Sequence, residues 1–271
     1  MKESNVKISV ITVCFNAATS IEATIRSVIR QTYPNIEYIV IDGGSTDGTV
    51  DIIKRYSDKI DYWVSEPDNG IYYAMNKGID AATGDYLNFM NAGDGFFNDD
   101  VVSKAVPMLD GFDFVAGIGA CTEKGKLTYG FWKPVEGSFE IKDIINGSIV
   151  NHQACFIKKD IFAKIKYDPS YPIIADEIHF LQSIYLKKYR YKPIDLIVSR
   201  YDIDGISGNP DIISEIMMQR KDFYLHNIPE ADFTDPQPAN HNPVAQLLID
   251  FKLSCIALWN RLFIGHPRLL K

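Results

Sequence analysis

The chain has few cysteines and histidines, no surplus of positive charge and no long apolar run. Its four cysteines, at positions 14, 121, 155 and 255, are widely spaced without a C-x-x-C pair, which argues against a disulfide framework. The five histidines are too dispersed to predict a zinc site. With 28 Lys and Arg against 35 Asp and Glu, the net charge is −7, and no stretch concentrates Lys and Arg as a nucleic-acid groove requires, which argues against nucleic acid as a partner.

No apolar stretch is long enough to cross a bilayer, and the amino terminus shows no apolar signal region. The sequence therefore predicts a cytoplasmic protein. Its 271 residues, 46% of them hydrophobic, are enough to bury a full core.

Short apolar runs alternate with helical patterns over the first 97 residues. Strands are expected at residues 6–15, 38–41, 62–65 and 86–90. Helices are expected between them, at residues 19–33, 49–56 and 71–79. Strict alternation of strand and helix predicts a parallel sheet with helices on both faces.

Each of these strands is followed by a polar turn, which contains Asn16, Asp42, Asp68 or Asp94. Ligands of open α/β sheets bind at the carboxyl ends of the strands, so these side chains predict one site. Asp94 is the first candidate for a group that handles metal or phosphate. The alternative is that Asp94-Gly95 is only a chain-reversing turn.

The second half alternates less regularly. Strands are expected at residues 112–116, 127–132, 154–157 and 194–198, and helices at 160–165 and 175–189. We interpret residues 1–235 as one domain, with a first half at 1–97 and a second lobe at 98–235. A proline-rich linker near 235–238 leads into a helical extension, 236–271, with a single helix expected over 244–264.

Four motifs in order resemble family 2 glycosyltransferases of the GT-A fold. These are Phe15-Asn16, residues 42–49 (DGGSTDGT), residues 68–78 (DNGIYYAMNKG) and the strand that ends at Asp94. The resemblance covers residues 6–207 and is closest to the bacterial polysaccharide-biosynthesis type. It implies an α/β, Rossmann-like, mostly parallel sheet. It also implies inverting transfer of a sugar from a nucleoside diphosphate, with UDP-sugar favoured, to an acceptor hydroxyl.

The resemblance also implies a donor site, in which Phe15 forms a wall for the base and Asp94 binds Mn²⁺ or Mg²⁺ beside the diphosphate. Phe15 could instead belong to the core. The full set of implied donor-binding residues is Val13, Phe15, Asp42, Asp68, Gly70, Asn76, Lys77, Asn91 and Asp94.

The sequence departs from the family pattern in four places, one of which is Ala175, where the family often has Glu before the base. Asn91-Ala92-Gly93-Asp94 replaces Asp-x-Asp-Asp, so only the last acid remains and the ribose contact is put in doubt. Asp42-Gly43 replaces two adjacent acids, which leaves the base contact to Asp42 or the backbone. Tyr73 stands where close relatives often carry Asp, and each of these last three changes is expected to tune the choice of donor.

Residues 175–177 (ADE), at the start of a helix, resemble the place where the family carries the Asp that takes the acceptor proton. The resemblance implies Asp176 as the base, with Glu177 as the fallback. The alternative is that Asp176 only caps the helix. Residues 151–153 (NHQ) resemble a family stretch near the acceptor and diphosphate side, which implies that His152 and Gln153 bind the acceptor. Residues 205–207 (GIS) resemble a loop that closes over the donor.

Two other functions remain open. A sugar nucleotidyltransferase would need a glycine-rich, basic loop after the first strand, and residues 14–17 (CFNA) provide none. A catalytically impaired protein that binds glycan or nucleotide sugar would explain the thinned acidic motif. Residues 244–271 contain Trp259, Phe263 and Arg261. They are expected to contact the inner face of the membrane near a lipid-linked glycan acceptor, to form a homodimer, or to fold back on residues 1–235.

Overall fold

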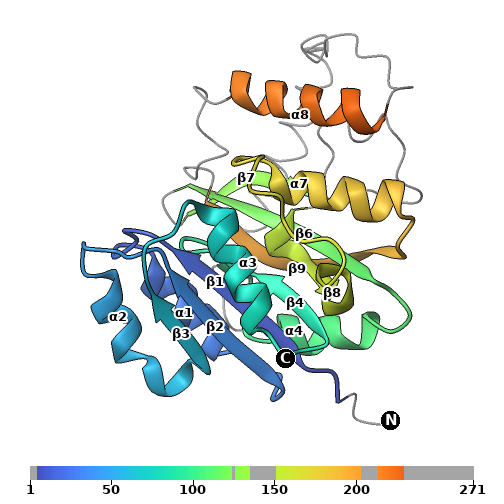
Figure 1. Cartoon of the computed structure of the whole chain (residues 1–271). Coiled ribbons are helices and arrows are strands. Elements are labelled where there is room, and N and C mark those ends of the chain that lie inside the picture. The colour runs from blue at the N-terminus through green and yellow to red at the C-terminus, as the bar shows by residue number, and fades with distance from the viewer. Residues whose placement is uncertain (1–4, 124–125, 135–150, 203–212, 229–271) are drawn as a thin grey trace. The chain divides into compact units, whose positions relative to one another are not determined.

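The computed structural model describes residues 5–123, 126–134, 151–202 and 213–228 (Figure 1). The strands are β1 Ile8–Cys14, β2 Ile36–Asp42, β3 Tyr62–Ser65, β4 Tyr86–Phe89, β5 Gly95–Phe96, β6 Phe114–Glu123, β7 Lys126–Trp132, β8 Cys155–Lys158 and β9 Tyr191–Asp202. The α-helices are α1 Ile21–Ile29, α2 Thr49–Arg55, α3 Ile71–Ala81, α4 Val101–Ala105, α6 Lys159–Phe162, α7 Ala175–Phe180 and α8 Ile213–Asn227.

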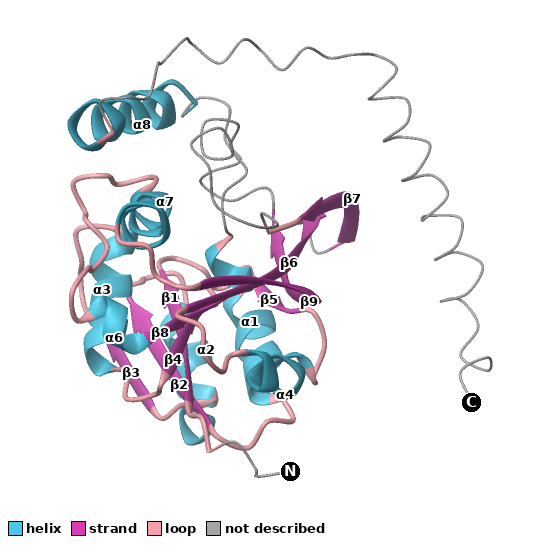
Figure 2. Ribbon diagram, turned by 90° about the vertical axis from the view of Figure 1, so that its right-hand side faces the viewer, coloured by secondary structure: helices cyan, strands magenta, loops and turns pink. Residues whose placement is uncertain are grey.

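One sheet runs through the described residues in the order β3-β2-β1-β4-β8-β6-β9-β5, with β7 paired to β6 (Figure 2). The first four strands are parallel: β1 pairs with β2 and β4, and β2 pairs with β3. The remaining strands are mixed, since β8 is antiparallel to β4 and β6, while β6 and β9 are parallel. The predicted parallel sheet is therefore confirmed for the first half, and the second half adds a mixed extension.

Helices cover both faces of the sheet, as the alternation predicts. On one face, Ile8 and Val10 of β1 pack in a cluster that includes residues of α1, α2 and α4. On the other face, Ile11 and Val13 pack with residues of α3, α6 and α7. Both faces of β1 are apolar because the strand is buried from both sides.

The observed elements differ from the expected ones in a few places. The helix expected at 175–189 ends at Phe180 and continues as a π-helical turn, Leu181–Leu186. Helices α4 and α8 and strand β5 were not expected. The predicted helix at 244–264 and the loop at 205–207 lie outside the described residues, and the chain divides into units at 1–231 and 232–271. In the described part, no helix is both long enough and apolar enough to span a membrane.

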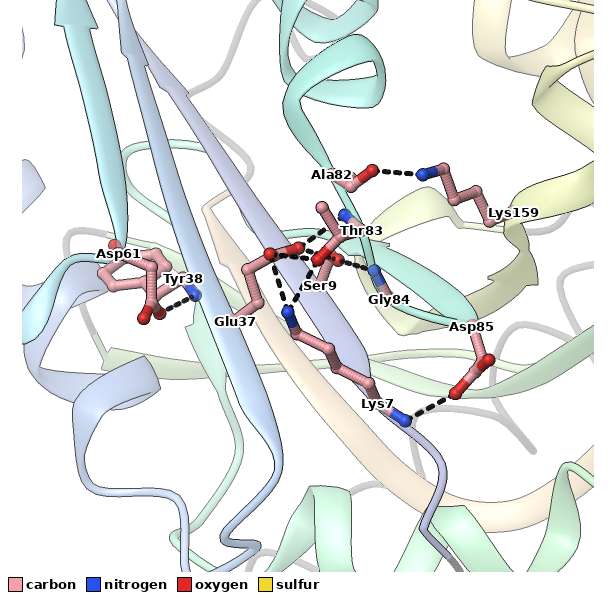
Figure 3. Close-up of polar contacts among 10 residues, drawn as sticks. All are labelled: Lys7, Ser9, Glu37, Tyr38, Asp61, Ala82, Thr83, Gly84, Asp85 and Lys159. Atoms are coloured by element: carbon pink, nitrogen blue, oxygen red, sulfur yellow. Dashed lines mark hydrogen bonds and ion pairs between the residues drawn. The ribbon is translucent and has the colours of Figure 1, made fainter.

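Glu37 fastens the amino-terminal ends of β1 and β2, at the sheet edge opposite the polar turns (Figure 3). Lys7, Ser9 and Thr83 all donate hydrogen bonds to its carboxylate. Partial burial works against ionisation of Glu37, but these hydrogen bonds outweigh it and lower its pKa to about 2. The network joins three segments that are distant in sequence.

Candidate active site

Two hydrogen-bonded loops form the sheet edge at the carboxyl ends of β1 and β2. Asn16 has a φ of 47°, and its Oδ1 accepts from the backbone N–H of Thr46 at 3.0 Å. Its own N–H donates to Oγ of Ser45 at 2.7 Å. Oδ2 of Asp47 accepts from the N–H of Ala18 at 2.9 Å. These bonds hold the loop 42–49 against the end of β1.

Asp42 is fully buried at the end of β2, and its carboxylate is occupied by neighbouring donors. Oδ2 accepts the N–H of Gly44 at 3.1 Å and the hydroxyl of Ser65 at 2.6 Å. Ser45 donates to both carboxylate oxygens. Burial raises the pKa of Asp42, but the hydrogen bonds from Ser45 and Ser65 outweigh burial and keep it below its usual value. Asp42 therefore organises the loop with its charged carboxylate.

Phe15, Gly43 and Asp68 lie together on this edge. Phe15 is 65% exposed, so its ring is not part of the core. A Cβ placed on Gly43 would lie 2.8 Å from Oδ2 of Asp68 and 3.4 Å from the Phe15 ring. Asp68 thus occupies the space that a side chain at position 43 would fill. An exposed ring beside a carboxylate suits a flat, hydrogen-bonding base.

Four other residues predicted to bind the donor are hydrogen-bonded or ion-paired to other groups of the protein. Asn76 exchanges hydrogen bonds with the backbone of Tyr167, at 2.8 and 3.2 Å. Lys77 pairs with Glu66 at 2.8 Å. The carbonyl of Val13 accepts the N–H of Ala92 at 3.0 Å, and Gly70 donates its N–H to Asp68 at 2.8 Å.

The turn after β4 carries Asp94 and is fastened to α1. Gly93 has a φ of 108°, a conformation that favours glycine. Its N–H donates to Oγ1 of Thr24 at 3.0 Å, and the Thr24 hydroxyl donates to the carbonyl of Asp94 at 2.6 Å. Thr24 is fully buried in α1, and its two hydrogen bonds attach the turn to this helix.

Two adjacent residues connect Asp94 to Asp176. Nε2 of Gln153 donates to Oδ2 of Asp94 at 2.9 Å. Nδ1 of His152 lies 2.7 Å from Oδ2 of Asp176, and Nε2 of His152 lies 3.2 Å from Nδ2 of Asn91. The structure therefore brings Asn91, Asp94, His152, Gln153 and Asp176, all predicted from the sequence, into one constellation.

Asp176 lies in the first turn of α7 with a donor on each carboxylate oxygen. The hydroxyl of Tyr72 is 2.7 Å from Oδ1, with the carbonyl of Ile173 also within its reach at 2.9 Å. Burial raises the pKa of Asp176, but the bonds from His152 and Tyr72 outweigh burial and lower it. Burial and the neighbouring Asp176 raise the pKa of Tyr72 well above its usual value, so the phenol stays protonated.

Glu177 makes an ion pair with Arg220 of α8 through both of its carboxylate oxygens, at 2.8 and 2.9 Å. Burial raises the pKa of Glu177 to about 7, and the guanidinium opposes that rise. The side chain of Glu177 is 8% exposed against 20% for Asp176, so Glu177 is the less accessible of the two to an acceptor.

No group of three or more His, Cys, Asp or Glu side chains suited to hold a metal occurs among the described residues. Asp94 provides a carboxylate at the sheet edge, and the side-chain amide of Gln153 donates to one of its oxygens. An ion here would take most of its ligands from a substrate and from water, which is how Mg²⁺ commonly binds phosphates.

Sequence reasoning did not find Thr24, Tyr72, Asn88 and Arg220 as supports of this site. Asn88 is fully buried in β4 and donates to the carbonyls of Gln153 and Cys155, at 3.1 and 3.0 Å. A polar residue within a buried strand is the one signal that marks Asn88 in advance.

Solved structures with a similar fold include complexes with a nucleotide or a nucleotide sugar. A TarS fragment from S. aureus, in complex with UDP, matches with a TM-score of 0.63 and 19% identity, over 81% of this chain and 65% of that chain. The mannosyltransferase PcManGT from Pyrobaculum calidifontis, in complex with GDP-Man and Mn²⁺, matches with a TM-score of 0.57 and 19% identity, over 79% of this chain and 61% of that chain. This chain thus spans less than two thirds of either. These matches define the class as an α/β protein with the GT-A fold.

The sequence comparisons identify the family. The model of Glycosyl transferase family 2 matches residues 9–165. An uncharacterized glycosyltransferase of Mycobacterium tuberculosis is 33% identical over 74% of this chain and 77% of its own length. A PGL/p-HBAD biosynthesis glycosyltransferase of Mycobacterium bovis is 29% identical over 62% of this chain and 66% of its own length. The chain belongs to glycosyl transferase family 2 and is an enzyme that transfers sugars.

Proposed function

We propose that this enzyme transfers a sugar from a nucleoside diphosphate sugar, with UDP-sugar favoured, to a hydroxyl of a glycan acceptor, with inversion. The proposal rests on the placement of Asp94 and Asp176 at the same end of the sheet, where the adjacent residues Gln153 and His152 contact one carboxylate each. In this proposal, Asp94 faces the diphosphate of the donor and Asp176 receives the proton of the acceptor hydroxyl. Family membership disfavours the sugar nucleotidyltransferase alternative.

The donor end of the proposal rests on Phe15 and Asp68. The exposed Phe15 ring offers a stacking face, and Asp68 offers a carboxylate oxygen that can accept from a base N–H. Support for a UDP-sugar comes from the TarS fragment, which was solved with UDP. PcManGT was solved with GDP-Man, so a screen of donors must include both bases.

Asp94 would hold the cation, Mn²⁺ or Mg²⁺, against the diphosphate. The bound ion would supply charge stabilisation to the donor and to the departing nucleotide. The turn that presents Asp94 is already fixed by Thr24 and by Gln153, so little reorganisation is needed on binding. PcManGT, solved with Mn²⁺, supports this choice of ion.

Asp176 would act as the base. The acceptor oxygen forms a bond to the anomeric carbon while the bond from that carbon to the diphosphate breaks, and the bonding electrons leave with the nucleotide. The acceptor proton passes to Asp176. A carboxylate with a lowered pKa is a weak base, so we expect the proton to move late, as the new bond forms. Attack on the face opposite the leaving group gives inversion.

Substitution of Asp176 by Asn tests the proposal. Transfer should slow by about a hundredfold to ten-thousandfold, while donor affinity with Mn²⁺ stays unchanged, because only the proton acceptor is lost. A thermal-shift screen of nucleotide sugars with Mn²⁺ identifies the donor. A ligand at a hundred times its dissociation constant adds about 2.7 kcal/mol to the free energy of unfolding, which raises the melting temperature. Donor binding without any transfer by the wild type would favour the catalytically impaired alternative.

We further propose that the acceptor is a lipid-linked glycan and that residues 244–271 hold the enzyme at the inner face of the membrane. Support comes from the sequence of this segment, in which Trp259 and Phe263 are interspersed with Arg261, Arg268 and Lys271. Co-sedimentation with anionic vesicles should capture the full chain but not a truncation after Asn240. If neither form binds and truncation turns a dimer into a monomer, the segment is an oligomer contact.

A further inference from the structure

The dipeptide His152-Gln153 contacts both carboxylates of the site. It lies in a short 3-10 turn, His152–Ala154, which falls in sequence between the turn that carries Asp94 and the helix that carries Asp176. The sequence places these two residues in the acceptor site. Their contacts in the structure point elsewhere, because each side chain is already engaged with a carboxylate.

The backbone of this turn is fixed on both sides. Oδ1 of Asn151 accepts from the N–H of Gln153 at 3.1 Å and caps the turn. Asn88, fully buried in β4, donates to the carbonyl of Gln153 at 3.1 Å. The side chains of His152 and Gln153 therefore extend from a backbone that is held in place, and their orientation is set before any ligand binds.

Both ring nitrogens of His152 have partners. Nδ1 lies 2.7 Å from Oδ2 of Asp176, which can only accept, so Nδ1 must carry the proton. Nε2 lies 3.2 Å from Nδ2 of Asn91, an amide donor, so Nε2 presents its lone pair in the neutral ring. The Asp176 carboxylate thereby sets the tautomer of the neutral ring, and the side-chain amide of Asn91 lies at the other nitrogen.

We propose that His152 and Gln153 are positioning residues that set the base and the metal-side carboxylate at a fixed separation, rather than residues that bind the acceptor. This inference rests on the proposed function. His152, with Tyr72 on the other oxygen, holds Asp176 in one orientation, and Gln153 holds Asp94. A reaction that needs donor and acceptor aligned depends on this spacing, because a shift of about 1 Å can cost about a hundredfold in rate.

The first test reads the tautomer in the wild-type protein without any substrate. In protein labelled with ¹⁵N-histidine, at a pH above the imidazole pKa, His152 should show a protonated Nδ1 and an unprotonated Nε2. His226, exposed on α8 and close to Asp222, gives a reference signal from a solvent-accessible ring. A neutral His152 ring protonated at Nε2 would overturn the proposal.

The second test separates positioning from acceptor binding. His152→Ala should lower kcat by about tenfold to a hundredfold with acceptor KM unchanged, because the acceptor does not touch the ring. His152→Asn, whose amide N–H can still reach Asp176, should recover part of kcat, and His226→Asn should match the wild type. A raised acceptor KM with unchanged kcat in His152→Ala would overturn the proposal.

The third test follows Gln153 through metal binding. Gln153→Leu should weaken Mn²⁺ binding, measured by calorimetry in the presence of UDP, by about tenfold. Unchanged Mn²⁺ affinity in this variant would contradict the role of Gln153. If the wild type transfers no sugar from any donor, the proposed function fails, yet the tautomer and the Mn²⁺ titration still decide whether the two residues position the carboxylates.

Discussion

The hydroxyl of Thr24 donates a 2.6 Å hydrogen bond to the main-chain carbonyl of Asp94, and it accepts the N–H of Gly93. Thr24→Val keeps the shape but leaves both backbone groups without this partner, at a cost of about 1–3 kcal/mol in the free energy of unfolding. We also expect a weaker apparent affinity for Mn²⁺ because the turn loosens. Thr24→Ser retains the hydroxyl and is the control; equal Mn²⁺ affinities in the two variants would contradict the prediction.

Asp94→Asn should reduce metal-dependent turnover by at least about a hundredfold, since loss of a charge-stabilising group costs on the order of 3 kcal/mol. The fold should persist because the residue lies in a turn at the sheet edge rather than in the core. Initial rates at saturating donor and Mn²⁺ measure the effect. Asp58→Asn, which neutralises an exposed carboxylate in another turn, is the matched control. Wild-type turnover in Asp94→Asn would rule out the metal assignment.

Breaking the Glu177–Arg220 pair should destabilise the protein. Arg220→Met leaves Glu177 buried without its cation, which costs on the order of 3 kcal/mol, and less to the extent that the guanidinium is a quarter exposed. Adding Glu177→Gln should restore part of the loss because the buried charge is removed. Urea unfolding measures both. Arg30→Met, which breaks an exposed pair with Asp99, should change little.

Glu37 makes the free energy of unfolding depend on pH in the acidic range. Its pKa falls from 4.5 when unperturbed to about 2 in the folded protein, so folding favours the charged form. The stabilisation it gives is complete above about pH 4.5 and is lost as the pH falls toward 2. Glu37→Gln should therefore lower the melting temperature at neutral pH and flatten its dependence on pH between these limits. An acid dependence as steep as that of the wild type would refute this account.

Much of the fold follows from the sequence because its signals are local. The strands β1 to β4 and the helices α1 to α3 appear as periodic apolar patterns, and a polar turn follows each of those strands. Such patterns depend on neighbouring residues, so they can be recognised without knowing the partners. Asp94 was found in this way, as a turn residue after a strand, whereas Asp176 was found through the family resemblance of residues 175–177. Helix α8 was not predicted, because the apolar residues of its sequence do not fall on one face of a helix.

What only the tertiary structure decided is how these residues meet. His152 is 24 residues from Asp176 and 61 from Asn91, and Tyr72 is 104 from Asp176. Their contacts depend on β8 pairing antiparallel to β4, and on α3 and α7 packing over the same face. Sheet order and helix packing are set by the burial of apolar faces across the whole chain, and a local sequence pattern carries no information on which faces meet.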